Sequence, residues 1–231
     1  FNGDGKRDLL WRNNVNGDVA MWLMNGTTVA SGPGLGNVSL GWTIVGAGDL
    51  DGDGKADIVW RGPDGEVAVW FMNGASVLAG PIVGAAPLTW TIAGVGDFDG
   101  NARADILWRG PAGEVAIWFM NGATLVSGPV VAGAPLSWSI AGVGDFDGNG
   151  KSDILWRNSS GEVAMWLMNG AAIASGPSLG VIGNDWRIVG AADFSGDNKA
   201  DILWRHDSGS TGYWAMNGAM LVSAPILGAV P

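Results

Sequence analysis

The chain has 231 residues, one His, no Cys and a formal net charge of −10. Nucleic acid is a disfavoured partner, because phosphate neutralisation needs clustered Lys and Arg. Apolar runs stay below the roughly 18 residues of a spanning helix, so we expect no membrane insertion. With one His, no Cys and one Tyr, we find no set of nucleophile, base and orienting group and expect no enzymatic activity.

The elements repeat along the chain. One tryptophan recurs every 48 residues, as Trp22, Trp70, Trp118, Trp166 and Trp214. In the copy over 90–136 we predict a strand at 90–97, an acidic loop, a strand at 104–110, a short turn and an alternating strand at 114–120. Asn121-Gly122 then predicts a tight hairpin. The fourth strand, 123–131, contains a Pro, which suits an outer edge.

Four antiparallel strands in each repeat predict an all-β fold, a β-propeller of five 48-residue blades. We expect a single domain over 1–231, with blade repeats at about 1–41, 42–89, 90–137, 138–185 and 186–231, each later repeat starting at its innermost strand. One innermost strand is missing from this pattern. The alternatives are a fragment of a longer array, imperfect ring closure, or a strand that another chain supplies.

A nine-residue acidic loop follows the first strand of each repeat. It reads DLDGDGKAD, DFDGNARAD, DFDGNGKSD and DFSGDNKAD, with a clipped copy, FNGDGKRD, at the start of the chain. Of the 22 acidic residues, 15 lie in these five loops. Oxygen side chains at positions 1, 3, 5 and 9, with the carbonyl of position 7, form a cage for a hard cation.

We therefore expect calcium as the cofactor. Transition metals prefer His or Cys, and the loops contain neither; an all-protein oxygen cage favours calcium over magnesium. The alternative is a set of Asx-rich turns without metal. The predicted metal ligands are Asp49, Asp51, Asp53, Lys55, Asp57; Asp97, Asp99, Asn101, Arg103, Asp105; Asp145, Asp147, Asn149, Lys151, Asp153; Asp193, Ser195, Asp197, Lys199, Asp201; and Asn2, Asp4, Lys6, Asp8, with Lys and Arg acting through their carbonyls.

The five sites are unequal. The loop from Asp49 is complete, and the loop from Asp145 replaces one carboxylate by an amide. At position 6 the chain needs positive φ, so Ala102 predicts strain where other copies have Gly. Ser195 replaces a carboxylate in the last loop, and the first loop lacks its first Asp.

These motifs, with GDFDGNGKSDILWR around Asp145 as the fullest example, resemble the FG-GAP or VCBS repeat propellers of secreted bacterial proteins. The pattern is also similar to the propeller of integrin α subunits and to propeller lectins of the Psathyrella velutina type. The resemblance implies calcium in the loops. The name-giving FG and GAP pairs are largely replaced by WRGP or WRN, which weakens an integrin-like adhesive interpretation.

Further tryptophans and arginines recur on the blade face that we expect to lie opposite the acidic loops. The candidate ligand-binding residues are Trp42, Trp90, Trp138, Trp186, Arg61, Arg109, Arg157 and Arg205. Trp rings can stack on a sugar, although a place in the core between blades is the alternative. Arginines recur in every blade, and across a hairpin each faces one residue: Arg12 faces Asp18, Arg61 faces Glu66, Arg109 faces Glu114, Arg157 faces Glu162 and Arg205 faces Ser210. The four acids predict cross-strand ion pairs; a ring of guanidinium groups for carboxylates or sugar hydroxyls is the alternative.

We therefore expect a non-catalytic calcium-binding propeller that binds carbohydrates multivalently. The alternative is a structural or protein-interaction propeller, an accessory domain of a larger secreted protein. Glycans or an extracellular protein are the expected partners, and another chain or a missing segment is expected to complete the first blade. Weak calcium loops fill at extracellular concentrations, so we expect an extracellular or secreted location.

Overall fold

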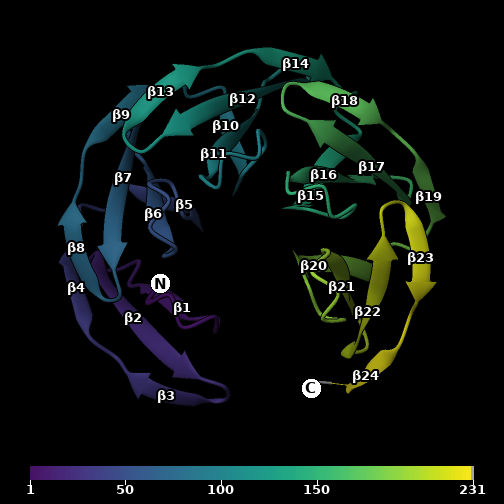
Figure 1. The fold of residues 1–231 in the computed structure, drawn as a ribbon, viewed down its shortest axis with the longest axis horizontal. Coiled ribbons are helices and arrows are strands. Elements are labelled where there is room, and N and C mark those ends of the chain that lie inside the picture. Colours follow the sequence, from purple (N-terminus) through teal and green to yellow (C-terminus); the bar gives the residue numbers. More distant parts are fainter. Residues whose placement is uncertain (230–231) are drawn as a thin grey trace. The chain divides into compact units, whose positions relative to one another are not determined.

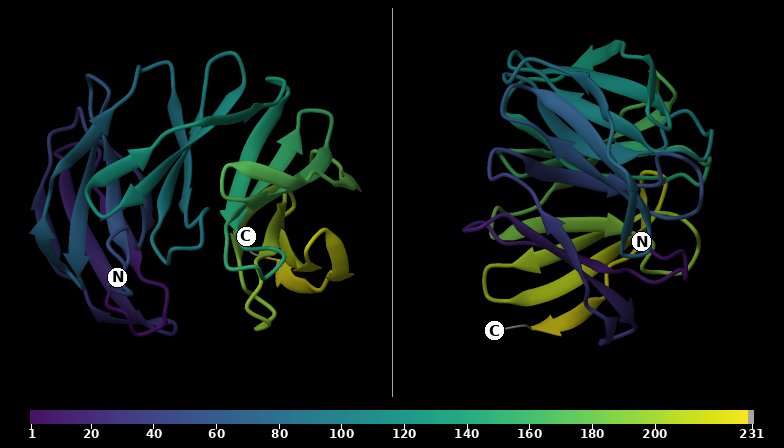
Figure 2. Two further views of the ribbon diagram at one scale, coloured as in Figure 1. Left: turned by 45° about the horizontal axis from the view of Figure 1, so that its top comes forward. Right: turned by 90° about the vertical axis from the view of Figure 1, so that its left-hand side faces the viewer.

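The computed structural model describes residues 1–229, which form strands and connecting loops (Figures 1 and 2). Within this range no helix is long and apolar enough to span a membrane. The strands form five antiparallel sheets, one for each sequence repeat. The predicted all-β fold, a five-bladed β-propeller, is confirmed.

The strands follow each other in chain order within each sheet. The first two sheets contain β1 (Leu9–Arg12), β2 (Asp18–Asn25), β3 (Thr28–Ser31), β4 (Gly34–Asn37), β5 (Thr43–Gly48), β6 (Asp57–Arg61), β7 (Glu66–Asn73), β8 (Ser76–Ala79) and β9 (Ile82–Ala85). The third contains β10 (Thr91–Gly96), β11 (Asp105–Arg109), β12 (Glu114–Asn121), β13 (Thr124–Ser127) and β14 (Val130–Gly133). The last two contain β15 (Trp138–Gly144), β16 (Asp153–Asn158), β17 (Glu162–Asn169), β18 (Ala172–Ser175), β19 (Ser178–Val181), β20 (Trp186–Ala192), β21 (Asp201–His206), β22 (Ser210–Asn217), β23 (Met220–Ser223) and β24 (Ile226–Ala229).

The outermost strand of each blade is broken in two. In the third blade β13 and β14 both pair with β12, and Gly128 and Pro129 separate them. Proline has no N–H to donate to the ladder. Its carbonyl still accepts a hydrogen bond of 3.2 Å from the backbone N–H of Ile117. The predicted fourth strand is therefore present, but proline divides it while keeping it attached to the blade.

The hairpin after the third strand differs by one residue from the prediction. Asn121 pairs with Thr124 and ends β12, so the two-residue loop is Gly122-Ala123. Gly122 has φ of 60°, a conformation that glycine adopts without steric cost. A loop with glycine at its first position belongs to the hairpin turns that match strand twist. Asn121 therefore keeps a strand conformation, and its side chain lies at the strand end.

Tertiary contacts divide the chain into two compact units. The first contains residues 1–95, 102–106 and 118–128, and the second contains 96–101, 107–117 and the chain from Pro129 onward. The residues of β10 to β14 are distributed between these units. The predicted single domain over 1–231 stays a prediction.

In the first unit the core lies between the first two sheets. Val19 and Met21 of β2 pack with Ile58 and Trp60 of β6, and all four are at most 1% exposed. Trp42 packs at the margin of this cluster. The alternation along β2 and β6 thus buries one side of each strand against the neighbouring blade.

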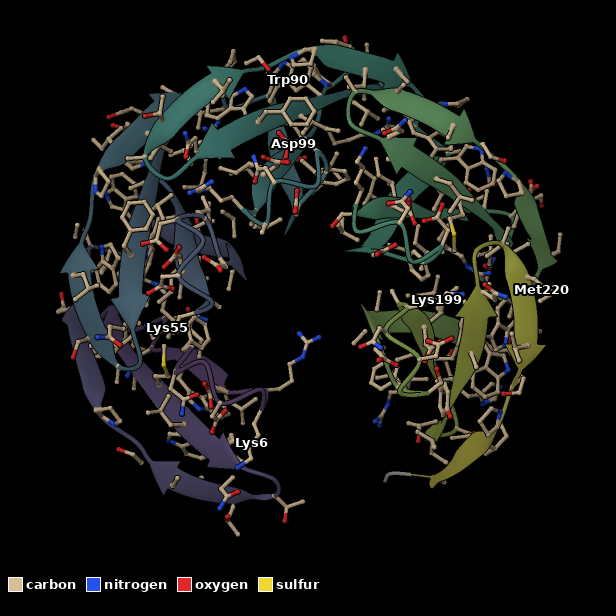
Figure 3. All side chains as sticks on the ribbon, viewed as in Figure 1. Lys6, Lys55, Trp90, Asp99, Lys199 and Met220 are labelled. Atoms are coloured by element: carbon tan, nitrogen blue, oxygen red, sulfur yellow. The ribbon has the colours of Figure 1, made fainter. Side chains whose placement is uncertain are left out.

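In the second unit an equivalent core lies between the last two sheets. Met165 of β17 packs with Ile202 and Trp204 of β21, and Trp186 borders the cluster. Within each unit one blade covers the next, which explains strands that are apolar on both sides. Met220, on the outer strand β23, lies on the outside and is 58% exposed (Figure 3).

Candidate functional site

The four acidic loops that begin with an aspartate are wrapped around the carboxylate of that residue. Asp49 Oδ1 accepts hydrogen bonds from the backbone N–H groups of Gly52 (2.7 Å) and Asp53 (3.1 Å). Its Oδ2 accepts one from Gly54 at 2.8 Å. The wrap recurs at Asp145, which accepts from Gly148 at 2.7 Å and Gly150 at 2.8 Å. The sequence spacing thus folds the loop around an oxygen-rich centre.

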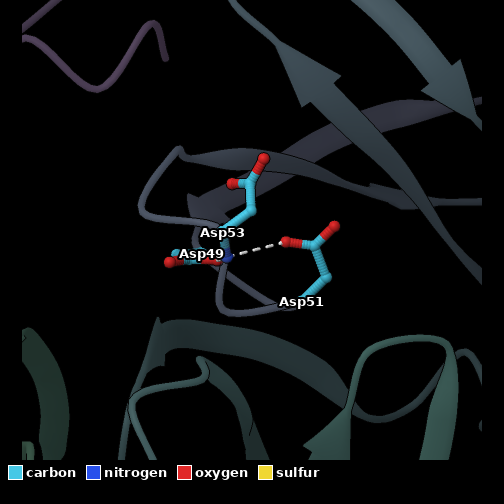
Figure 4. Close-up of side chains that lie close together, drawn as sticks. All are labelled: Asp49, Asp51 and Asp53. Atoms are coloured by element: carbon cyan, nitrogen blue, oxygen red, sulfur yellow. Dashed lines mark hydrogen bonds between the residues drawn. The ribbon is translucent and has the colours of Figure 1, made fainter.

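Three carboxylates gather in the second loop. Oxygen atoms of Asp49, Asp51 and Asp53 lie within 4.8 Å of one another. Figure 4 shows these side chains, with the backbone N–H of Asp53 donating to Asp51 Oδ1 at 3.1 Å. Hard oxygen donors at this separation fit a calcium ion, which binds oxygens at about 2.3–2.6 Å. Positions 1, 3 and 5 are therefore brought together as predicted, and this group can hold a metal ion.

A second group of acids forms in the fourth loop. Carboxylate oxygens of Asp145, Asp147 and Asp153 lie within 4.8 Å of one another. Asn149 at position 5 donates its backbone N–H to Asp147 Oδ1 at 3.1 Å. Here the buried ninth position takes part in the group, because position 5 is an amide.

The aspartate at position 9 has a structural task that the sequence pattern did not reveal. Asp57 is completely buried at the start of β6. Its Oδ2 accepts a hydrogen bond from Leu50 in the loop, and its Oδ1 accepts one from Met72 in β7, both at 2.9 Å. Asp153 makes the same bonds with Phe146 (2.9 Å) and Met168 (2.7 Å). This residue therefore ties the acidic loop to the third strand of its own blade.

Burial changes the protonation of this ninth position. Removal from water raises the pKa of the Asp57 carboxyl to about 6, against the opposing hydrogen bonds from Met72 and Leu50. Burial likewise raises the pKa of Asp153 to about 7, and the nearby Asp147 and Asp145 add to the effect. A cation in the loop would stabilise the charged forms.

The basic residue at position 7 contributes its side chain as well as its carbonyl. Lys6 Nζ donates to Asn25 Oδ1 at 2.8 Å, and Lys199 Nζ donates to Asn217 Oδ1 at 2.5 Å; Lys199 is marked in Figure 3. Lys151 bonds Asn169 in the same way. In these three loops the asparagine that ends β2, β17 or β22 thus anchors the lysine of the loop. Lys55 instead pairs with Asp53 at 3.0 Å, beside the carboxylate group.

Backbone conformation at position 6 agrees with the prediction. Ala102 has φ of 63° and Asn198 has φ of 65°, and they are the two non-glycine residues with positive φ among the described residues. Gly54 and Gly150 occupy the position in the fuller loops, with φ of 82° and 81°. The unfavourable conformation of Ala102 is therefore imposed by the loop.

The remaining loops keep parts of the arrangement. Asp97 accepts from Gly100 at 2.7 Å, and Asp99 accepts from Asn101 at 3.1 Å. Asp193 accepts from Gly196 at 2.6 Å and from Asn198 at 2.9 Å, and these hydrogen bonds lower its pKa. The buried Asp105 and Asp201 accept backbone hydrogen bonds from Met120 and Met216, respectively.

The other predicted ligands are bound within or between loops. Asp197 accepts from the Lys199 N–H, Ser195 donates its N–H to Asp201, and Arg103 Nε donates to the Asp51 carbonyl. In the first loop Asn2 accepts from the Asp4 N–H, and Asp4 accepts from the Lys6 N–H.

In the first loop the last aspartate, Asp8, is hydrogen-bonded to Phe1. Asp8 accepts a hydrogen bond of 2.8 Å from the Phe1 amino group and one of 2.8 Å from Met24 N–H. Phe1 therefore takes the place that Leu50 has beside Asp57. These hydrogen bonds and the positive charge keep the pKa of Asp8 below its usual value, although burial opposes them.

Neighbouring blades hold the acidic loops from outside. The hairpin amide of Gly122 donates to the Leu50 carbonyl at 3.0 Å, and that of Gly218 donates to Phe146 at 2.8 Å. The amide of Ala200 in the fifth loop donates to the Asp145 carbonyl at 2.7 Å. Acidic loops and glycine hairpins therefore lie on the same side of the blades, and the loops from Asp49 and Asp145 depend on the next blade for their position.

The recurring arginines bind carbonyls, so the predicted cross-strand ion pairs are wrong for Arg12 and Arg157. Arg12 donates to the carbonyls of Val38 (3.1 Å) and Ser39 (2.9 Å). Arg157 donates to those of Gly161 (2.6 Å) and Ile182 (2.8 Å). The loop after the outermost strand places its carbonyls within hydrogen-bond distance of the guanidinium group. Strand register alone does not predict this contact.

The same guanidinium groups lie over tryptophans of the following blade. Arg12 Cζ is 5.1 Å from the Trp60 ring centroid, Arg109 is 5.0 Å from Trp156, and Arg157 is 5.4 Å from Trp204. Burial lowers the pKa of Arg61, Arg109 and Arg157. The arginines therefore connect blades. The sequence signal for this contact was the nearly constant spacing between each Arg and the contacted Trp, which is 48 residues for Arg12 and 47 for Arg109 and Arg157.

A groove of about 720 Å³ lies in the second unit near the start of β20. Its polar lining comes from Ser137, Ser139, Asn158, Ser159, Asn184 and Arg187, with Trp186 and Arg157 beside them. The half-buried Trp186 is a predicted ligand residue, and its backbone N–H closes a turn by bonding the Gly183 carbonyl at 3.0 Å. Trp42, Trp90 and Trp138 follow equivalent turns. The groove thus combines one aromatic ring with hydroxyl and amide groups.

The single histidine lies next to this groove. His206 Nε2 is 2.8 Å from Asp185 Oδ2, and its ring packs against Trp186 with a centroid distance of 4.9 Å and an interplanar angle of 60°. Its Nδ1 accepts the backbone N–H of Ser208 at 3.0 Å and lies 2.7 Å from the Ser208 hydroxyl. The imidazole therefore closes the turn between β21 and β22 and supports the tryptophan.

Fold and loops together define a repeat β-propeller with oxygen-rich loops on its blades. A model of the FG-GAP-like repeat matches the chain four times, over residues 1–60, 49–108, 97–156 and 145–204. The chain therefore belongs to the FG-GAP-like repeat family. A search of curated proteins found no match.

Proposed function

We propose that this protein is a non-catalytic, calcium-stabilised propeller that binds glycans outside the cell. The observation that supports calcium is the gathering of Asp49, Asp51 and Asp53 oxygens within 4.8 Å. Three carboxylates at this separation repel each other without a counter-charge, so a divalent cation would relieve a real cost. The donors are all hard oxygens, which suits calcium.

The groove near Trp186 supports glycan binding. Its volume of about 720 Å³ is in the range of small-molecule sites. A pyranose offers an apolar face that stacks on an indole and hydroxyls that bond to Asn and Ser. Arg157 is already occupied by backbone carbonyls, so the groove amides and hydroxyls are the better recognition groups. Arg61 and Arg109 likewise donate to backbone carbonyls, Arg61 to Ala86 at 2.7 Å and Arg109 to Ala134 at 2.6 Å. Arg205 is a candidate ligand residue from the sequence only.

A second candidate is a structural or protein-interaction propeller, an accessory domain of a larger secreted protein. Large apolar side chains on the outer strands favour it: Leu78, Val126 and Val222 are 61%, 64% and 59% exposed. Exposed apolar residues on the outer strands of three blades suit contact with an extracellular protein. This alternative shares the calcium loops and differs in the ligand.

Calorimetric titration of the metal-free protein with calcium tests the first part of the proposal. We expect saturable binding to at least two loops, and absence of heat and of any change in melting temperature would contradict it. A glycan array in millimolar calcium tests the second part. Binding that disappears in an Asn158→Ala/Asn184→Ala variant supports the groove. No glycan above background would favour the protein-interaction alternative.

A further inference from the structure

The inner edge of the first sheet differs from that of the other sheets. Over residues 1–229, β1 pairs with β2, whereas β6 pairs with β5 on one side and β7 on the other. The strands β16 and β21 also pair on both sides. An unpaired edge leaves a row of N–H and C=O groups open, and proteins normally cover such edges.

A cavity of about 350 Å³ lies in the first unit beside the loop that leads into β1. The first acidic loop forms one wall, with Phe1, Gly3 and Asp8. Ala47 at the end of β5 and Ala56 before β6 form the opposite wall. Ala47 is exposed and Ala56 is half-buried. The cavity therefore extends from the sheet edge to the next blade.

The second unit shows what occupies this space elsewhere. Ala191 and Ala200 lie three repeats after Ala47 and Ala56. A Cβ placed on Gly142 would be 3.3 Å from the Ala191 Cβ, and one on Gly144 would be 2.7 Å from the Ala200 Cβ. The Gly-x-Gly backbone of β15 thus lies directly against these alanines, and Ala200 is 7% exposed.

We propose that the cavity beside β1 receives an extended strand with the sequence pattern W-x-I-x-G-x-G-D, supplied by another FG-GAP-like repeat segment. Two glycines in the pattern allow the close approach to Ala47 and Ala56, which any side chain would prevent. The strand would satisfy the open edge by β-augmentation. It would also continue the interface that β15 and β20 form within the second unit.

The register of the incoming strand follows from the pairing of β15 with β16. Ile140 lies opposite Trp156, Gly142 opposite Leu155, and Gly144 opposite Asp153. Transferred to β1, the isoleucine pairs with Trp11 and the second glycine pairs with Asp8. Leu10, which is half-buried where Leu155 is fully buried, would lose its remaining exposure.

The same strand would complete the first acidic loop. Its last residue, an aspartate, would lie next to Phe1 and add a carboxylate to the oxygen donors already present, which are the Asn2 amide and the Asp4 and Asp8 carboxylates. Phe1 already holds the second position of this loop through its 2.8 Å bond to Asp8. This consequence rests on the proposed calcium function, whereas the pairing of the strand with β1 does not.

Peptide complementation tests the proposal. A fluorescein-labelled peptide with the sequence of residues 137–145, SWSIAGVGD, is titrated into the 231-residue chain in EDTA and in calcium, and binding is followed by anisotropy. We expect saturable binding in both buffers, with hydrogen-exchange protection of the Leu9–Arg12 amides. Tighter binding in calcium would support completion of the loop, and equal binding would reject that consequence alone.

Matched variants locate the peptide. A peptide carrying Gly142→Val and Gly144→Val should bind about tenfold more weakly or worse, because the glycine contacts leave no space. Ala47→Leu in the protein should have the same effect, whereas Ala79→Leu on exposed β8 should have none. No binding, binding without protection of β1, or equal binding of the valine peptide would overturn the proposal. If the Ala47→Leu protein does not fold, the comparison of the wild-type and valine peptides still tests the proposal.

Discussion

Arg12 of the first blade lies over the indole of Trp60 in the second, with 5.1 Å between its Cζ and the ring centroid. The same guanidinium donates hydrogen bonds to the Val38 and Ser39 carbonyls in the loop between these blades. One side chain therefore connects a strand, a loop and the neighbouring core. The relationship recurs between Arg157 and Trp204.

Replacing this guanidinium should destabilise the interface between blades. Arg157→Lys removes hydrogen bonds to at least two carbonyls and the planar contact with Trp204, which a lysine cannot reproduce. We expect a loss of about 1–3 kcal/mol in the free energy of unfolding, measured by urea denaturation. Arg187→Lys is the control, because its ion pair with Asp207 is exposed and should contribute less than about 1 kcal/mol. Equal effects of both substitutions would contradict the assigned role.

Loss of the first carboxylate should abolish metal binding at the second loop. Asp49→Asn removes one ligand charge and disturbs the wrap made by Gly52, Asp53 and Gly54. We expect one fewer calcium in titration calorimetry and a smaller rise in melting temperature on calcium addition, because a ligand stabilises the state that it binds. Asp64→Asn, in an exposed turn, is the control. An unchanged stoichiometry would refute the assignment of this loop.

Relief of backbone strain should strengthen the third loop. Ala102 has φ of 63°, so Ala102→Gly should raise the free energy of unfolding by about 0.5–1 kcal/mol in EDTA. The comparison is Ala79→Gly in exposed β8, where added chain entropy should lower stability by a similar amount. Opposite signs in chemical denaturation would confirm the strain, and a destabilised Ala102→Gly protein would exclude it.

Metal-free protein should lose stability as the pH rises. Burial raises the folded-state pKa of Asp57 to about 6 and that of Asp153 to about 7, from 3.8 for an ordinary aspartate. A raised pKa means that the folded state holds its proton more strongly than the unfolded state. The associated stability is complete below pH ~4 and declines until the pH has passed the folded pKa values.

Urea denaturation between pH 5 and 8 measures this effect. In EDTA the unfolding free energy should fall across this range, while saturating calcium should flatten the curve by holding both carboxylates ionised. The lowered pKa values of Asp8 and Asp193 act in the opposite direction, at pH values below this window. If the unfolding free energy in EDTA rises from pH 5 to 8, the raised pKa values of Asp57 and Asp153 do not control the pH dependence of stability.

Local patterns in the sequence predicted the strands and loops well, because their signals lie within a few residues. Alternation over 114–120 marked β12, and the positive φ of Ala102 followed from its position in the acidic loop. The break between β13 and β14 was less visible, since a proline at an outer edge is compatible with either a continuous or a divided strand.

The sequence by itself determined the repeat, its strand order, the family and the oxygen-rich loops, since these depend on spacing and residue type. Tertiary structure decided the partners of residues that reach across blades. In the structure Arg12 contacts the Val38 carbonyl and the Trp60 indole instead of a cross-strand acid. Asp57 is buried, with hydrogen bonds from the acidic loop and from β7. The hydrogen-bond partners and the pKa values of these residues depend on which groups are buried together. Burial of this kind is decided by the packing of one blade on the next.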